Sequence, residues 1–377
     1  MSSAPAGLSA PVHAPGLLAA LADLPDPRAR RGVRHALCTV VGAAVCAVVA
    51  GCRSYTAIGE WVADLPADTA QMLGIDPRRR PSEAMLRRLL QGLDADRLTA
   101  VIAAWLATRI PATGARRAIA VDGKSVRGSR TAGSAARHVL AACDQATGAV
   151  LASTDVDGKT NEITRFQPLL DQIDNLTGVV VTADALHCQR EHVAYLAQRG
   201  AHWILTVKGN QPHLHAHLTA LPWRAVPDAE RTSDRGHGRR EIRSLKILSI
   251  STGIDFPHAA QAIQVRRRRR RLDQPKRFTT ETVYAITDLR VHQATPAHLA
   301  NWARGHWSIE NKVHWVRDVT YDEDRSQIRT GTGPQVMAAL RNAAISALRL
   351  TGVTNTAAAN RHHARDSHRP LALLGIT

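Results

Sequence analysis

The sequence is short of aromatic residues and of cysteine, and its first residues show no export signal. Phe, Trp and Tyr make up 4% of the 377 residues, whereas hydrophobic residues together make up 44%, so the core must be built mainly from Ala, Val, Leu and Ile. Five cysteines without a C-x-x-C pair argue against a disulfide framework and a zinc ribbon, and favour thiols in a reducing cytoplasm. The opening "MSSAPAGLSAPVHAPG" has no basic segment that leads into an apolar run, so we expect no secretory signal.

Long hydrophobic runs are also scarce. Residues 36–52, "ALCTVVGAAVCAVVAGC", carry no charge, but the run is shorter than the roughly 20 residues of a typical membrane span. It is rich in Ala, Gly, Thr and Cys, which are weakly hydrophobic compared with Leu. We therefore expect a buried helix and no membrane association.

Acidic residues are outnumbered: 32 Asp and Glu face 49 Lys and Arg, which gives a net charge of +17. This balance favours a nucleic acid as partner over a ribosomal or anionic membrane surface. Arg266–Arg271 are six consecutive arginines and cannot form an ordinary buried strand, so they are either a DNA-backbone contact or a solvated hairpin end. No G-x-x-x-x-G-K-[ST] motif occurs, which argues against ATP-driven action.

The length predicts two or three domains, and the periodicity of apolar residues changes along the chain. The patterns predict a flexible N-terminus (1–14), a helical domain with possible DNA binding (15–112), an α/β domain (115–352) with a β-rich insertion (210–289), and a loose C-terminal tail (353–377).

Two aspartates come directly after predicted central strands of the α/β domain. Asp122 follows "RAIAV" and Asp184 follows "GVVVTA", and neighbouring strands lie about 4.8 Å apart. Carboxylates so placed could share Mg²⁺ ions for phosphoryl transfer. Each aspartate could equally cap the turn or helix that follows it.

The acid-rich stretch "IENKVHWVRDVTYDEDRS" offers a third carboxylate. On a regular helix Glu310, His314 and Arg317 share one face, so a basic stripe could follow DNA away from a metal-bound Glu310. Asp318 lies about 12 Å further along the axis, too far to share that metal. Glu323 is the alternative third ligand.

Two tryptophans, Trp307 and Trp315, lie in or beside the same stretch. They are expected to be packing anchors rather than base-stacking platforms.

These motifs together resemble the DDE transposases of bacterial insertion sequences, in the ISAs-type branch. The carriers are "AVDGKSVRGS", "GKTNEITRF", "TADALHCQRE", "VKGNQP", "RGHGRREIRS" and "RGHWSIENKVHWVRDVTYDEDRS", with "LPDPRARRGVRHAL" and "SYTAIGEW" in the helical region. The resemblance implies an α/β fold: a ribonuclease H-like mixed sheet flanked by helices, with a β-rich insertion and an N-terminal all-helical domain of the transposase-associated type.

The resemblance also implies site residues and cofactors. Asp122, Asp184 and Glu310 would be the catalytic residues and would bind two Mg²⁺ ions, with Mn²⁺ as a possible substitute. The family's Tyr, Arg, Glu, Lys signature is matched only in part, because Ala303, His306 and Arg317 stand at the other three positions. The expected DNA-contacting residues are Lys124, Lys208, His306, His314 and Arg317.

The implied activity is cleavage of transposon ends and joining of the freed 3′-OH to target DNA. The partner would be double-stranded DNA, both the terminal inverted repeats and the target, bound by a homodimer or larger assembly in the cytoplasm at the nucleoid. Two alternatives stay open: a metal-dependent nuclease of the same fold with another role, and a non-catalytic DNA-binding descendant of a transposase.

Overall fold

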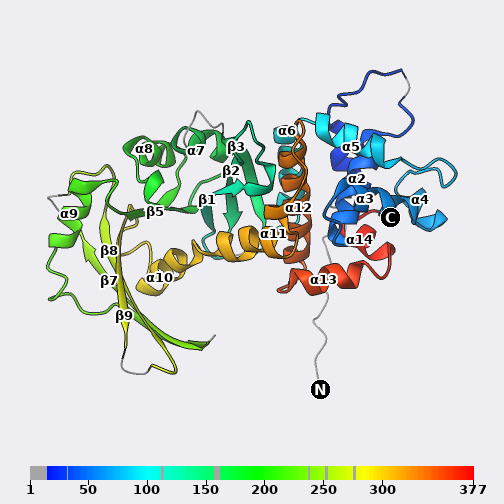
Figure 1. Cartoon of the computed structure of the whole chain (residues 1–377). Coiled ribbons are helices and arrows are strands. Elements are labelled where there is room, and N and C mark those ends of the chain that lie inside the picture. Colours follow the sequence, from blue (N-terminus) through cyan, green and yellow to red (C-terminus); the bar gives the residue numbers. More distant parts are fainter. Residues whose placement is uncertain are drawn as a thin grey trace.

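The chain folds into a helical region and a sheet-based region that lie side by side (Figure 1). The computed structural model describes residues 15–31, 33–111, 114–156, 162–236, 238–250, 254–274 and 277–377. The predicted flexible segment 1–14 and residues 158–161 of the "GKTNEITRF" motif lie outside these ranges.

The N-terminal region is helical, as the sequence predicts. Its elements are α1 (Leu17–Ala20), η1 (Leu21–Asp23), α2 (Leu37–Val49), α3 (Tyr55–Ala63), α4 (Ala67–Met72), α5 (Glu83–Gly92) and α6 (Ala95–Ala107). The uncharged run forms α2, which is buried along almost its whole length, so the prediction of a buried helix is confirmed. None of the described helices combines the length and apolar composition needed to cross a bilayer.

The last part of the chain returns to this helical region. It forms α12 (Gly333–Leu350), α13 (Thr356–His363) and α14 (His368–Leu373). The side chains of α1 to α6, α12 and α14 share one apolar core. The expectation of a loose tail is therefore wrong, because Leu371, Leu374 and Ile376 are buried in that core.

The two ends of the described chain meet. The backbone N–H of Leu17 donates to the carbonyl of Leu374 at 3.0 Å. Trp105 on α6 donates its indole N–H to the carbonyl of Pro15 at 3.1 Å. The first and last elements thus close the same core.

The described strands of the second region form one nine-stranded mixed sheet in the order β3-β2-β1-β4-β5-β9-β8-β7-β6. The strands are β1 (Ala118–Val126), β2 (Arg137–Asp144), β3 (Val150–Val156), β4 (Val180–Ala183), β5 (His202–Val207), β6 (Glu230–Gly236), β7 (Arg239–Ser249), β8 (Gln261–Arg271) and β9 (Thr279–Thr287). β1, β4 and β5 run parallel, and β2 and β9 pair antiparallel at either side of them. This is the ribonuclease H-like mixed sheet that the sequence predicts.

Helices cover both faces of the core strands. α7 (Glu162–Leu170), η3 (Ala185–His187) and α8 (Arg190–Gln198) lie on the face to which Val121 of β1 points. α10 (Pro296–Gly305) and the segment after it lie on the opposite face, against Ala118 and Ala120. Alternate residues of β1 therefore look toward different helices.

Two details of the sheet differ from expectation. β1 continues four residues past Asp122, still paired with β2, whereas its pairing with β4 stops at Val121 opposite Ala183. The predicted insertion contains α9 (Pro212–Ala220) and β6 to β9, and β9 pairs with β5. The inserted strands therefore extend the core sheet instead of forming a separate sheet.

The predicted single acid-bearing helix is broken. α10 ends at Gly305, a short turn follows, and a π-helical turn, η4 (Glu310–His314), leads into α11 (Trp315–Val319) and η5 (Glu323–Arg325). A π turn inserts one extra residue, which rotates the following side chains by about 100° around the axis. Such turns occur frequently at functional sites.

Candidate active site

The first carboxylate, Asp122, projects from an interior position of β1. It pairs with Ala141 of β2, one residue past the point where β4 leaves the ladder. Its side chain shares the face of Ala120, toward the segment that follows α10. The next residue must be small, because a Cβ on Gly123 would collide with the Glu162 carboxylate on the opposite face.

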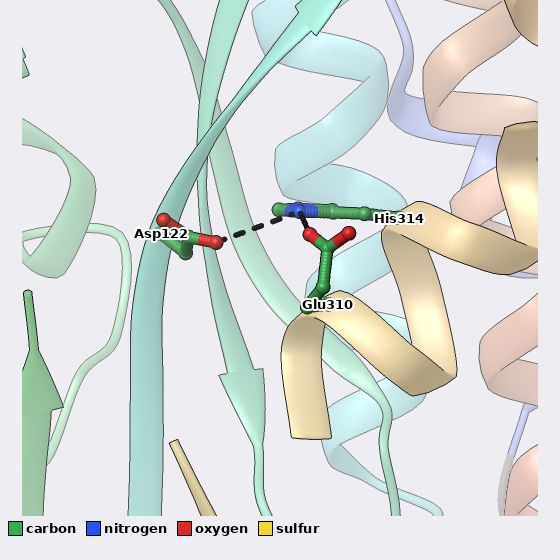
Figure 2. A group of neighbouring side chains, drawn as sticks. All are labelled: Asp122, Glu310 and His314. Carbon is green, nitrogen blue, oxygen red and sulfur yellow. Dashed lines mark hydrogen bonds and ion pairs between the residues drawn. The ribbon is translucent and has the colours of Figure 1, made fainter. Parts of the chain in front are cut away.

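Glu310 and His314 face Asp122 from the π turn (Figure 2). The Nδ1 atom of His314 lies 3.2 Å from Oε2 of Glu310 and 3.6 Å from Oδ2 of Asp122. The His314 side chain is 3% exposed, whereas that of Glu310 is 51% exposed. The imidazole is thus inserted between two carboxylates, one of which opens to solvent.

The local electrostatics are unbalanced toward negative charge. Burial raises the pKa of Asp122 to about 6; His314 partly offsets this, and the nearby Asp184 and Glu162 carboxylates add to it. The hydrogen bond with His314 instead holds the pKa of Glu310 below its usual value. A carboxyl group that ionises reluctantly beside other acids indicates a place where a cation would be stabilised.

The donor set fits a divalent metal ion. Ligand atoms of Asp122, Glu310 and His314 all lie within 4.8 Å of one another. Two carboxylates are suitable ligands for Mg²⁺ or Mn²⁺, and these ions keep other positions for water and phosphate oxygens.

Asp184 follows β4 and lies close enough to Asp122 to influence its pKa. One of its oxygens accepts the backbone N–H of Leu186 at 2.9 Å and so caps η3. Capping of η3 and binding of a metal ion are therefore compatible roles for Asp184, since its carboxylate has a second oxygen that can coordinate an ion.

Glu323 is not part of this acid group. It is fully buried, and its carboxylate accepts hydrogen bonds from Arg317 at 3.0 Å and Arg341 at 2.9 Å. Burial alone would raise the pKa of Glu323, but the two guanidinium groups hold it at about 2. Glu323 is a poor third metal ligand, because the two arginines already neutralise its charge and hydrogen-bond to its oxygens.

Arg317 does not continue the face of Glu310 toward DNA. Its side chain is fully buried beside Glu323. The extra residue of the π turn explains this, because it rotates α11 so that Arg317 points into the protein. The predicted basic stripe from Glu310 through Arg317 is therefore wrong.

The other expected DNA contacts lie in different surroundings. Lys124 is buried, and its Nζ atom donates to Asp318 at 2.7 Å. Burial lowers the pKa of His306 to about 4, so at neutral pH this ring is uncharged beside Thr182. Lys208, just past the end of β5, is exposed.

The two tryptophans beside the acid are exposed. Trp307 is 59% and Trp315 is 55% exposed, and Val319, one helical turn beyond Trp315, is also exposed. The expectation that they are packing anchors is wrong. The same rotation that buries Arg317 turns Trp315 outward.

One neighbouring cluster was not found from the sequence. Glu162, behind Gly123, accepts from His138 at 2.6 Å and lies 3.3 Å from His187. Burial alone would raise its pKa, but these two histidines hold it at about 2. The local signal was that Gly123, the neighbour of Asp122, has no side chain. Three residues from three separate elements, however, cannot be joined by spacing alone.

Comparison with known families identifies the family of the chain. The model of the family described as "Transposase DDE domain" matches residues 113–347, and a model described as "DDE_Tnp_1-associated" matches residues 18–106. The chain belongs to the DDE transposase family. Membership supports a transposase role, divalent-metal binding and action on DNA.

Named relatives agree with this membership. The chain is 28% identical over 347 residues to putative transposase YncI of Escherichia coli O157:H7, covering 88% of this chain and 87% of that protein. It is 26% identical over 345 residues to H repeat-associated putative transposase YhhI of Escherichia coli K12, covering 88% and 90%. A solved structure, the piggyBac transposase synaptic complex with hairpin DNA, is 10% identical, with a TM-score of 0.43 over 95% of this chain and 78% of that one.

Proposed function

We propose that this DDE transposase cleaves DNA at transposon ends and joins the freed 3′-OH to target DNA, with Asp122, Asp184 and Glu310 as catalytic metal ligands. The observation that carries the proposal is the convergence of Asp122 and Glu310, 188 residues apart in sequence, on one imidazole. The buried ion pairs at Glu323 neutralise that acid inside the fold. At this site a half-exposed carboxylate is left facing solvent instead.

The three acids have distinguishable tasks. Asp122 is fixed by the β1–β2 ladder and supplies a rigid ligand. Asp184 keeps its position by capping η3. Within the described part of the chain, the one side-chain hydrogen bond of Glu310 is to His314 in the π turn, so Glu310 can adjust when the ions and the scissile phosphate arrive.

Two Mg²⁺ ions, replaceable by Mn²⁺, would supply charge to offset the scissile phosphate and would lower the pKa of the attacking water or 3′-OH. His314 orients Glu310 through the 3.2 Å hydrogen bond. Asp122 must lose its proton before it can serve as a ligand, so the affinity of the site for the ions should weaken as the pH drops below about 6. Because two DNA ends are joined in one event, we propose that at least two copies act together on DNA.

The test uses purified protein, a duplex carrying the inverted repeats that bound the gene, and Mg²⁺. Asp122→Asn, Asp184→Asn and Glu310→Gln should each lower strand cleavage by at least about 10³-fold, about 4 kcal/mol of transition-state stabilisation. Asp324→Asn is the matched control, since this acid of the same stretch pairs at the surface with Arg127 and should keep wild-type cleavage. Undiminished cleavage by the Glu310 variant would refute its assignment.

Two other outcomes address the alternative functions. Cleavage without joining of the 3′-OH to a second duplex would indicate a nuclease of the same fold. Binding to DNA without any metal-dependent cleavage would indicate a non-catalytic descendant.

A further inference from the structure

The six consecutive arginines form most of strand β8 in a ribbon with β7 and β9 that projects from the body of the molecule (Figure 1). Side chains alternate between the two faces of a strand, so the run is divided into two sets of three. Arg267, Arg269 and Arg271 point to one face, and Arg266, Arg268 and Arg270 point to the other.

The face with the odd-numbered arginines carries its own counter-charges. Glu241 lies opposite Arg269, and Glu281 lies opposite Arg267. Arg269 donates to Glu281 at 2.9 Å, and Arg267 lies 3.2 Å from Glu241. Arg271 pairs with Asp273, and Arg243 pairs with Glu241. Within the described strands β6 to β9, Arg239 is the one arginine of this face without an ion pair. We call it the paired face.

The opposite face carries only positive charge. The strand register places Arg240 opposite Arg270, and Arg235 opposite Arg240. On β9, Thr280 and Thr282 lie on this face opposite Arg268 and Arg266. Its six arginines, none of which forms an ion pair within the described part of the chain, are Arg231, Arg235, Arg240, Arg266, Arg268 and Arg270. We call it the open face.

Local contacts hold part of the open face in order without neutralising it. The guanidinium groups of Arg268 and Arg270 lie 4.6 Å and 5.4 Å from the ring centre of Phe278. Such stacking restrains the planar group while its N–H donors stay available at the edge. Arg240 donates to the hydroxyl of Ser233 at 3.4 Å, which is a neutral partner.

Like charges this close destabilise a sheet unless an anion lies over them. Successive arginines on one face are about 6.8 Å apart along the strand, which is twice the 3.4 Å axial spacing of phosphates on one DNA strand. A row of planar guanidinium groups at that spacing matches a phosphate backbone.

We propose that the open face binds the phosphate backbone of duplex DNA, while the paired face is a structural ion-pair network. The inference rests on the proposed function for its partner, which is the DNA on which a transposase acts. The open face is a DNA-binding surface outside the site formed by Asp122, Asp184 and Glu310. The proposal also specifies which three arginines of the run contact DNA.

The experiment compares two triple variants with equal loss of charge. Arg266→Gln with Arg268→Gln and Arg270→Gln removes half of the open face, and Arg267→Gln with Arg269→Gln and Arg271→Gln changes the paired face. Binding of the full-length variants to a fluorescent 30-base-pair duplex of arbitrary sequence is measured in EDTA between about 50 and 200 mM salt. Circular dichroism confirms that both variants keep the sheet.

Loss of three phosphate contacts should lower the slope of log affinity against log salt by about 2.7 in the open-face variant. The wild type should then lose about 40-fold more affinity than this variant across that salt range. The paired-face variant should change the slope by less than 1. Equal slopes for the two variants, or a larger change in the paired-face variant, would overturn the proposal.

The outcome is separable from that of the proposed function, because no metal or cleavage enters the binding measurement. Absence of cleavage together with the predicted slopes would refute the catalytic proposal and leave the open face standing. Cleavage that the acid variants abolish, together with equal slopes, would refute the open face alone.

Discussion

Glu310 and Glu323 lie within one acid-rich stretch, and the protein uses them in opposite ways. Glu310 is half exposed, and among the described residues its side chain hydrogen-bonds to His314 alone. Glu323 has no exposed surface and is held by two buried arginines. The difference is one of charge compensation: the fold itself neutralises Glu323, whereas under the proposed function a bound metal ion would neutralise Glu310.

The largest expected effect is on the neutralised acid. Glu323→Gln leaves Arg317 and Arg341 buried without a counter-charge, so the free energy of unfolding should fall by about 3 to 5 kcal/mol. Glu310→Gln, which removes a half-exposed charge, should change it by less than about 1 kcal/mol. Urea unfolding followed by circular dichroism measures both, and equal losses would erase the contrast between the two acids.

A smaller effect with the opposite sign is expected at Asp122. Because its pKa is raised to about 6, the folded protein holds this proton more tightly than the unfolded chain, whose Asp pKa is about 3.9. The free energy of unfolding of metal-free protein therefore falls as the pH rises through about 4 to 6. Asp122→Asn removes that penalty, so it should stabilise the protein by roughly 1 to 3 kcal/mol at pH 8.

The control for this prediction is pH itself. At pH 5 in EDTA, where Asp122 is mostly protonated, the gain from Asp122→Asn should be smaller than at pH 8. If Asp122→Asn is less stable than wild type at pH 8, the protein itself already neutralises the charge of Asp122 in the absence of metal.

The smallest effect is expected on the exposed side of the acid helix. Trp315→Ala should change the free energy of unfolding by less than about 0.5 kcal/mol, because the ring is 55% exposed. The adjacent Val316→Ala is the matched control, and it should cost about 1 to 3 kcal/mol because Val316 is buried. A large loss from the tryptophan variant would mean that the exposed side also contributes to the fold.

The sequence predicted which segments form helices and strands better than it predicted which way their side chains point. Apolar patterns ending near Asp122 and Asp184 were enough to predict two neighbouring central strands, which are β1 and β4. The six arginines of β8 were visible in the sequence as one run. Most of the carboxylates that pair with half of these arginines, however, come from β7 and β9. Strand register decides which arginine meets which acid, and single-sequence patterns do not specify register.

Spacing in the sequence predicts only the local contacts of the candidate site, and the grouping of its three distant acids came from the family resemblance. Glu310 and His314 are one helical turn apart, so their contact follows from spacing. The π turn between them was not predictable from periodicity, and it reverses the exposure of Arg317 and Trp315. The partner of Glu323 on α12, Arg341, lies beyond an intervening loop, and only tertiary packing brings it there.

The meeting of Leu17 with Leu374 has a consequence for how the chain is made. Helices α1 to α6 leave the ribosome first, yet the helices that complete their core, α12 and α14, are synthesised last. At about 5 to 20 residues per second, the nascent helical region waits roughly 10 to 50 s with α2 incompletely covered. A transcript cut short in the catalytic region would therefore yield a protein that has lost more than its acid helix, since its first-made domain would have no finished core.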